Sequence, residues 1–157
     1  MEKPRTWIQR KALDPLLSEL RHGATPEGMA TSAAVAAILA IVPVFGITTA
    51  LCFLAGRLFR LNHVIMQGVN CLMYPFQLLL ILPFLRIGET LLGADRLVLS
   101  PASYAAEFSA SPWGFFEKFG KAIALSSLGW VLCAPPALWA LNGLLRVLFR
   151  KTAARFQ

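Results

Sequence analysis

The 157-residue sequence is poor in the side chains on which metal sites, disulfide frameworks and most catalytic centres depend. It contains two histidines, three cysteines and eight acidic residues. Cys52, Cys71 and Cys133 lie inside apolar runs without C-x-x-C spacing, so we interpret them as small hydrophobic residues. No nucleophile and base stand at a recognisable spacing, and no glycine-rich phosphate loop is present. We therefore predict a protein that is not an enzyme and that uses neither a metal nor a cofactor.

Charge is also scarce, whereas apolar residues are in excess. Charged residues make up 15% of the chain and hydrophobic residues 57%, with a mean hydropathy of +0.61, whereas a soluble domain has about 25% charged residues. A chain of this length cannot bury such an excess in its own core, so the composition predicts an integral membrane protein. The net charge of +7 lies beside apolar runs, which is typical of contact with anionic membrane lipids. No basic patch interleaved with aromatic residues lies outside these runs, so we expect no nucleic-acid partner.

The first 22 residues predict an amphipathic cytoplasmic arm. Asp14–Gly23 carries helix-start and helix-stop residues at its two ends, with leucines on one face and basic residues opposite. Such a helix can lie on the membrane surface or pack on the rest of the protein, and the sequence leaves both interpretations open. No A-x-A cleavage site follows a short apolar region, so we expect the first 28 residues to stay on the protein.

Residues 23–93 hold two apolar segments. Thr25 and Pro26 are typical of a helix start, and Pro43 and Gly46 then interrupt an apolar run that continues to Leu61. An unbroken helix between Pro26 and Leu61 would be about 54 Å long, against a hydrocarbon core of about 30 Å. The first segment is therefore broken: it either crosses as a kinked helix or bends and returns to the side it entered. The second apolar segment contains two internal prolines.

Residues 94–114 have the composition of a polar loop, in which Ser111 and Pro112 repeat the helix-start pattern. Residues 115–157 predict a last transmembrane helix, with two adjacent prolines inside it, and a basic tail. We therefore predict a single membrane domain over residues 1–157. Its fold class is all-α: an integral membrane helical protein with an N-terminal amphipathic helix, a broken or re-entrant first apolar segment and two kinked transmembrane helices.

The distribution of basic residues bears on topology. Eleven of the fifteen lie in the N-terminal arm, at Arg57 and Arg60, and near the C-terminus, while the other four surround the polar loop together with four acids. A first segment that returns as a hairpin places all eleven on one side of the membrane. The positive-inside rule favours this arrangement, with both termini cytoplasmic. Three crossings, which place the termini on opposite sides, stay open as the alternative.

Three groups of residues are candidate sites. The first is an anionic-ligand site at the helix break, where a helix N-terminus can face an anion; its residues are Pro43, Gly46, Thr48, Thr49, Arg57 and Arg60. The second is an intramembrane polar stripe with helical spacing, which either lines a path for a headgroup or ion or forms interhelical hydrogen bonds; its residues are His63, Gln67, Asn70, Tyr74 and Gln77. The third is an ion pair three residues apart, Arg86 and Glu89, in which Arg86 can instead snorkel to the headgroups.

Part of this pattern resembles a known family. The residues that carry the resemblance are Gly23-Ala24-Thr25-Pro26, Ala30, Val42-Pro43, Gly46, Thr48-Thr49, Arg60-Leu61-Asn62, Asn70, Tyr74-Pro75, Gly88 and Leu92-Gly93. Over residues 23–93 the chain resembles a bacterial family catalogued as domain of unknown function 2062. The resemblance implies a multi-pass protein of the bacterial inner (cytoplasmic) membrane. Some members are joined to, or encoded near, enzymes that modify envelope glycans or lipids, and no established activity is implied.

Two functional hypotheses follow. The first is binding or translocation of a lipid-linked or otherwise anionic envelope component, by a homo-oligomer because so few helices enclose a pathway poorly. The second is a non-transporting scaffold or assembly partner for an envelope-modifying enzyme. Neutralising Arg57, Arg60 or Arg86 separates the two hypotheses, because a transporter would lose activity while still inserting and a scaffold would tolerate the changes.

Overall fold

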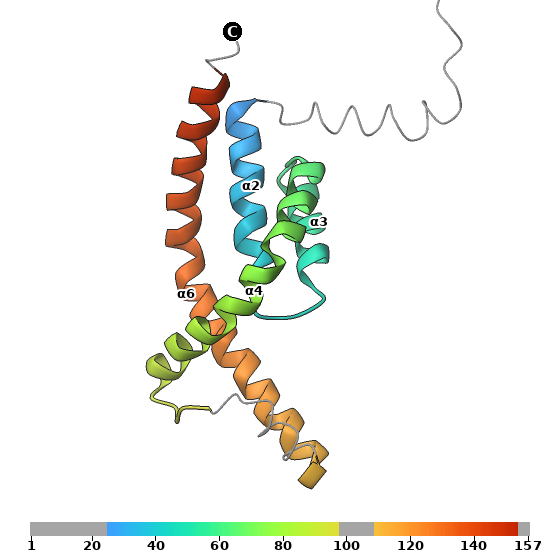
Figure 1. Ribbon diagram of the computed structural model, residues 1–157, viewed down its shortest axis with the longest axis vertical. Helices are drawn as coiled ribbons and strands as arrows, with labels where there is room; N and C mark the ends of the chain where they lie inside the picture. Colours follow the sequence, from blue (N-terminus) through green and yellow to red (C-terminus); the bar gives the residue numbers. More distant parts are fainter. Residues whose placement is uncertain (1–24, 98–108, 154–157) are drawn as a thin grey trace, which may run out of the picture.

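The computed structural model describes residues 25–97 and 109–153 of the chain. Within these ranges it contains four helices and no strand: α2 (Pro26–Ala40), α3 (Thr48–Leu58), α4 (His63–Leu92) and α6 (Pro112–Ala153) (Figure 1). The all-α prediction is confirmed for this part of the chain. The predicted amphipathic arm, residues 1–22, lies outside the described residues, and so do residues 98–108 of the predicted polar loop.

Polar side chains cap the starts of three helices. The Thr25 hydroxyl accepts a hydrogen bond from the Gly28 N–H at 3.1 Å, and Asn62 Oδ1 accepts one from the Ile65 N–H at 3.0 Å. Ser111 caps α6 in the same way. Each bond satisfies one of the backbone N–H groups that a helix start leaves without an intrahelical partner. The threonine–proline and serine–proline patterns in the sequence therefore predicted two helix starts correctly.

α2 and α3 run antiparallel and are joined by residues 41–47 (Figure 1). This linker contains Pro43, which disfavours helical geometry at the residue before it. It also contains Gly46, whose φ of +84° lies in the left-handed region that residues with a Cβ rarely adopt. Along their axes α2 measures about 22 Å and α3 about 16 Å. Neither helix would reach across a hydrocarbon core of about 30 Å.

α4 and α6 are the two described helices that are long and apolar enough to cross a membrane. Two prolines lie inside each of them without ending the helix, and kinks at these prolines stay a prediction. Only 22% and 17% of their most apolar windows are buried within the molecule. A core helix of a soluble protein would bury most of such a window, so the low figures indicate membrane association.

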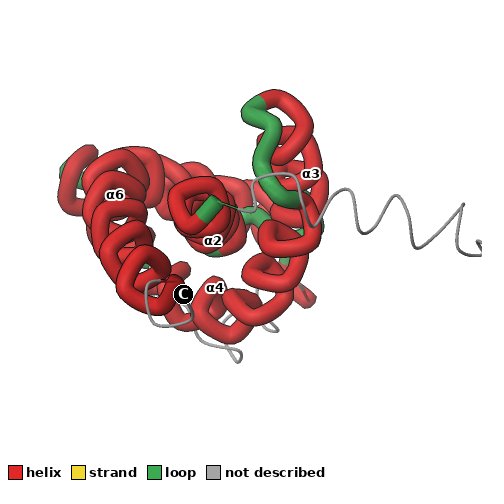
Figure 2. Tube along the Cα trace, turned by 90° about the horizontal axis from the view of Figure 1, so that it is seen from above, coloured by secondary structure: helices red, strands yellow, loops and turns green. Residues whose placement is uncertain are grey.

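α2 is the most enclosed helix. Seen from above, it lies between α6, α4 and α3 (Figure 2), and it contacts all three. Its buried residues are mostly small: Ala30, Ser32, Ala34, Ala36, Ala37, Ile38 and Ala40. A helix that is apolar all round is typical of a fully surrounded position, and small side chains let neighbouring backbones approach closely.

α4 and α6 cross where each helix contributes a glycine. A Cβ added to Gly88 would collide with the backbone carbonyl of Leu125, and one added to Gly129 would collide with that of Phe84. The contact is therefore reciprocal and made by backbone atoms. Because a backbone carbonyl cannot swing aside as a flexible side chain can, glycine is required at both positions if the helices are to keep this separation.

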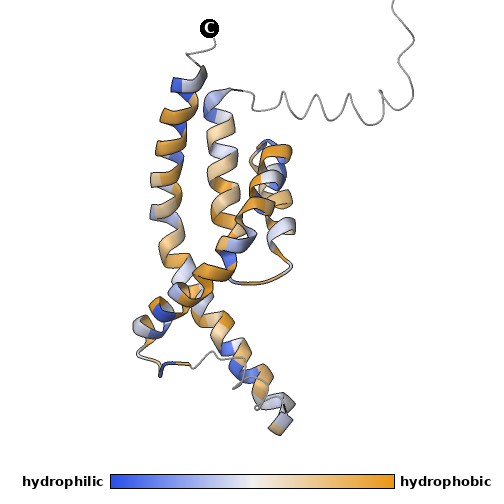
Figure 3. Cartoon of the chain, viewed as in Figure 1, coloured by the Kyte–Doolittle hydropathy of each residue, from blue (hydrophilic) through white to orange (hydrophobic). Residues whose placement is uncertain are grey.

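Burial differs from that of a soluble protein, although the buried core is still mostly apolar. Several polar residues are fully buried, among them Ser32, Asn62 and Gln77, whereas Leu72 and Trp139 are 71% and 82% exposed. In Figure 3 apolar residues extend along the lengths of α4 and α6, and hydrophilic residues gather near the helix ends. Polar residues turned inward and large apolar residues turned outward are expected of a chain whose solvent is lipid.

Candidate functional site

Donors from both long helices reach the end of α2 and the start of the linker. The Gln77 Nε2 group donates to the Val42 carbonyl at 2.7 Å, and the Trp130 indole N–H donates to the Ile38 carbonyl at 3.1 Å. These carbonyls lie where α2 ends, and the last carbonyls of a helix have no intrahelical partner. Side chains of α4 and α6 therefore donate to backbone acceptors at the break in the helix, where the Val42 carbonyl also accepts from the Val44 N–H at 2.8 Å.

The predicted polar stripe of α4 faces the α2–α3 hairpin over most of its length. Gln67 Nε2 donates to the Thr49 carbonyl at 3.4 Å, and Asn70 Nδ2 donates to the Thr49 hydroxyl at 3.1 Å. The His63 ring packs against Phe53, with ring centroids 5.2 Å apart. Gln77 holds the linker, as described above. Four of the five stripe residues thus contact the hairpin, whereas the fifth, Tyr74, is exposed.

Arg86 and Glu89 pair near the C-terminal end of α4. The Arg86 Nη1 to Glu89 Oε2 distance is 2.7 Å, and the Glu89 side chain is 3% exposed. The other carboxylate oxygen accepts from the Leu97 N–H at 2.8 Å, while Arg86 Nη2 donates to the Leu97 carbonyl at 3.3 Å. The pair therefore holds the segment after α4 against that helix, and both charged groups have partners.

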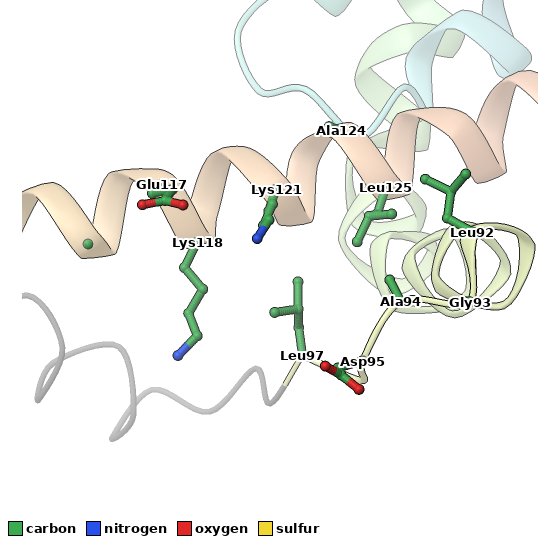
Figure 4. A pocket seen from close by; sticks show the side chains of 11 residues that line it. Leu92, Gly93, Ala94, Asp95, Leu97, Glu117, Lys118, Lys121, Ala124 and Leu125 are labelled. Atoms are coloured by element: carbon green, nitrogen blue, oxygen red, sulfur yellow. The ribbon is translucent and has the colours of Figure 1, made fainter.

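A groove lies between this segment and the N-terminal half of α6 (Figure 4). Its volume is about 810 Å³, within the range of roughly 300–1,000 Å³ typical of ligand sites. Leu92, Leu97 and Leu125 supply apolar lining. Lys118 and Lys121 extend from α6 on the groove side (Figure 4). The groove thus combines an apolar lining with two ammonium groups.

Because of the directions in which the helices run, charged residues lie at the two ends of the molecule. Arg150 Nε lies 2.8 Å from Glu27 Oε1, so the C-terminal end of α6 meets the start of α2. The Asn62 N–H donates to the Ser32 hydroxyl at 3.0 Å, which brings the α3–α4 turn to the same end (Figure 1). The described basic residues at this end are Arg57, Arg60, Arg146, Arg150 and Lys151; those at the other end are Arg86, Arg96, Lys118 and Lys121.

The chain matches the profile of a known protein family. The profile of a family described as an uncharacterized protein conserved in bacteria (DUF2062) matches residues 9–156. The chain belongs to this family. The match confirms the resemblance seen over residues 23–93 and extends it through α6. Comparison with curated proteins and with solved structures gave no match.

The six residues of the predicted anionic-ligand site do not come together in this DUF2062 chain. Thr48, which is buried, starts α3, whereas Arg57 and Arg60 lie at its other end, about 14 Å or more along the axis. Arg60 adopts a φ of +52°, and the next N–H bonds back to the Gly56 carbonyl at 2.9 Å. This is a helix-ending arrangement usually made by glycine. Both arginines are exposed, and within the described part of the chain neither forms an ion pair.

The lysine groove is the feature that sequence reasoning missed. Its walls come from residues 92–97 and 114–125, which the sequence separates by the polar loop. The available signal was local: Lys118 and Lys121 are three residues apart and therefore share one face of a helix. The facing wall depends on how α4 crosses α6, which no local pattern specifies.

Proposed function

We propose that this protein is an integral inner-membrane protein that binds a phosphate-bearing envelope lipid in the α4–α6 groove, as part of the binding or translocation of a lipid-linked component. The observation that carries the proposal is the pairing of an apolar groove lining with Lys118 and Lys121. Acyl chains need apolar walls, and a lipid phosphate accepts charge-assisted hydrogen bonds from ammonium groups.

Helix length and charge support the membrane placement. Residues 63–85 of α4 and 122–145 of α6 contain no charged side chain, and each stretch measures about 35 Å as a helix. That length exceeds a hydrocarbon core of about 30 Å. Basic residues flank both stretches. In this placement the two long helices cross the bilayer, and the groove lies at the level of the headgroups.

The α2–α3 hairpin then enters and leaves the membrane on one face. Its tip, which includes Phe45 and Ile47, is exposed and apolar, and neither arm is long enough to cross. Non-helical backbone at such depth needs hydrogen-bond partners from the protein. Gln77 supplies one to Val42 in the linker, and Trp130 donates to the last turn of α2. Both termini and the α3–α4 turn lie on the cytoplasmic side, because five described basic residues and one acid, Glu27, gather there.

The groove is a local site and not a broad positive field. Two acids, Asp95 and Glu117, also line it, so long-range attraction for a polyanion is weak. A phosphate must reach the lysine ammonium groups to gain from them. An aromatic residue beside the groove, Trp113, is 81% exposed, which suits the headgroup level, where tryptophan is enriched.

Binding of a short-chain lipid tests the proposal. The probe is dioctanoyl phosphatidylmethanol, which presents one phosphodiester and no hydroxyl group, added to the full chain purified in detergent. We expect Lys118→Gln/Lys121→Gln to weaken binding about a hundredfold if both lysines bind the phosphate and about tenfold if one does, because each lost charge-assisted bond is worth about 1.5 kcal/mol and 1.4 kcal/mol is tenfold.

A matched variant at the opposite end serves as the control. Arg57→Gln/Arg60→Gln removes the same number of charges but lies away from the groove, so we expect its affinity to stay within twofold of the wild type. The reverse pattern would move the site to the cytoplasmic arginines. Equal affinity in all three proteins would leave the scaffold hypothesis as the better account.

A further inference from the structure

Two buried amide oxygens of α4 near the hairpin have no hydrogen-bond donor in the described part of the chain. Asn70 is 4% exposed and Gln77 is 1% exposed. Among the described residues, Asn70 Oδ1 and Gln77 Oε1 have no hydrogen-bond partner. A buried acceptor without a donor costs about 1–3 kcal/mol in a protein interior. Two such atoms seven residues apart, on one face of α4, point to a ligand that donates hydrogen bonds.

The orientation of the Gln77 amide is fixed by its neighbour. Its Nε2 group donates to the Val42 carbonyl, so turning the amide over would set two acceptor oxygens against each other. Asn70 is held in the same region, because its Nδ2 group donates to the Thr49 hydroxyl. A carbonyl only accepts, so the Gln77 amide is anchored through its nitrogen, whereas the Thr49 hydroxyl can accept or donate and does not by itself fix the Asn70 amide. In the structure both amide oxygens have no donor among the described residues.

The start of α3 adds donors to the same region. The N-cap residue of this helix, Ile47, has an apolar side chain and makes no capping hydrogen bond. The first N–H groups of a helix have no intrahelical partner, and here they belong to the turn that contains Thr49, the residue bonded to Asn70. Backbone donors and amide acceptors thus occur together at the linker.

We infer that the linker, with Asn70 and Gln77 on one side and the start of α3 on the other, is a site for hydroxyl groups. A hydroxyl both donates to an amide oxygen and accepts from a backbone N–H. A bare anion is disfavoured because it would meet two acceptor oxygens. A cation is disfavoured because the N-terminal end of α3 carries the positive end of the helix dipole. The hydroxyl belongs either to water or to the glycerol or sugar part of a lipid headgroup.

This inference does not depend on the lysine groove, which lies among residues 92–125. The first experiment compares dioctanoyl phosphatidylglycerol with dioctanoyl phosphatidylmethanol, two lipids of equal charge of which only the first carries glycerol hydroxyls. If a headgroup fills the site, phosphatidylglycerol at ten times its Kd raises the Tm of the full chain by about 4 °C more than phosphatidylmethanol does.

Variants assign that excess to one site or the other. We expect Asn70→Leu/Gln77→Met to abolish the excess rise in Tm and Lys118→Gln/Lys121→Gln to keep it. Loss of the excess in the lysine variant alone would overturn the inference and would favour the groove instead. The comparison of the two lipids on the wild-type chain needs no variant, so it remains decisive if the amide variant does not fold.

The second experiment detects water. Asn70→Cys and Leu72→Cys are made in a chain whose three native cysteines are replaced by alanine, and each is treated with a small charged methanethiosulfonate. Leu72 is 71% exposed and faces hydrocarbon in the proposed placement, two residues away from Asn70. If water fills the site, Asn70→Cys reacts at least about tenfold faster, because the reactive thiolate forms only where water reaches.

Either positive result supports a hydroxyl site and identifies the source of the hydroxyl. An excess rise in Tm with phosphatidylglycerol assigns it to a headgroup. Fast reaction of the Asn70→Cys variant without that excess assigns it to water. Equal Tm with the two lipids together with equal reaction rates at the two positions would overturn the inference.

Discussion

Replacing Gly88 with alanine should force α4 away from α6. The added Cβ would meet the backbone carbonyl of Leu125, which no rotamer change can remove. Overpacking of a well-packed interior costs about 1–3 kcal/mol. The higher helix propensity of alanine offsets at most about 1 kcal/mol. We expect the overpacking cost to lie toward the upper part of its range, because the obstacle is a backbone carbonyl. The net effect is then a loss of stability.

Gly143→Ala is the matched control. It lies in α6, and within the described part of the chain no atom beyond its chain neighbours and the adjacent backbone of its own helix lies within 4 Å of the position that its Cβ would take, so only the gain in helix propensity remains. For a chain of this length, 1 kcal/mol corresponds to about 2–4 °C in Tm. We expect Gly88→Ala to lower Tm by about 4–10 °C and Gly143→Ala to leave it unchanged or slightly raised.

The assay is thermal unfolding of the full chain in detergent, followed by fluorescence-detected size exclusion. Gly129→Ala adds a second test, because its Cβ would meet the Phe84 carbonyl across the same crossing. One separation of the helices relieves both clashes, so the double variant Gly88→Ala/Gly129→Ala should lose less than the sum of the single losses. Equal Tm for Gly88→Ala and Gly143→Ala would refute the close crossing.

Three further predictions concern single contacts. Gln77→Leu removes the 2.7 Å hydrogen bond to the Val42 carbonyl, which keeps the Val44 N–H as a donor. It should cost about 0.5–1.5 kcal/mol in thermal unfolding, more than Gln67→Leu, whose bond is longer. Glu89→Ala removes the acceptor of the Leu97 N–H, so exchange of that amide, measured by mass spectrometry, should rise about tenfold or more. Unchanged exchange would contradict the role of Glu89 in holding the segment after α4. A backbone hydrogen bond of its own and then Arg150 hold the pKa of Glu27 below its ordinary 4.5, so its stabilisation is present above pH 4.5 and is lost as pH falls further. The Tm difference between wild type and Glu27→Gln should therefore shrink on acidification, and a difference that grows would contradict the pairing.

Helix-capping and helix-breaking residues predicted much of the fold, because they act on neighbouring backbone groups. Thr25 and Ser111 cap helices that start at the following prolines. The linker with Pro43 and Gly46 separates α2 from α3. The helix end at Arg60 gave no such signal, because a left-handed conformation is usually marked by glycine or asparagine.

The candidate site was less predictable because it depends on helix direction and crossing. Spacing alone put Gln67, Asn70 and Gln77 on one face, and the structure turns that face toward the hairpin. The distance between Thr48 and Arg57 follows from the helix rise along α3, but it requires knowing that α3 begins at Thr48 and continues unbroken past Arg57. The groove beside Lys121 needs two segments that only the folded chain brings together.

Side-specific labelling tests the central claim, that the α2–α3 hairpin returns to the membrane face it entered. Single cysteines are placed by Arg57→Cys, Lys118→Cys and Lys151→Cys in a chain without native cysteines, and membrane vesicles are treated with an impermeant maleimide from each side in turn. We predict that Arg57→Cys and Lys151→Cys are labelled from the same side and Lys118→Cys from the opposite side. Labelling of Arg57→Cys from the side that labels Lys118→Cys would contradict the account.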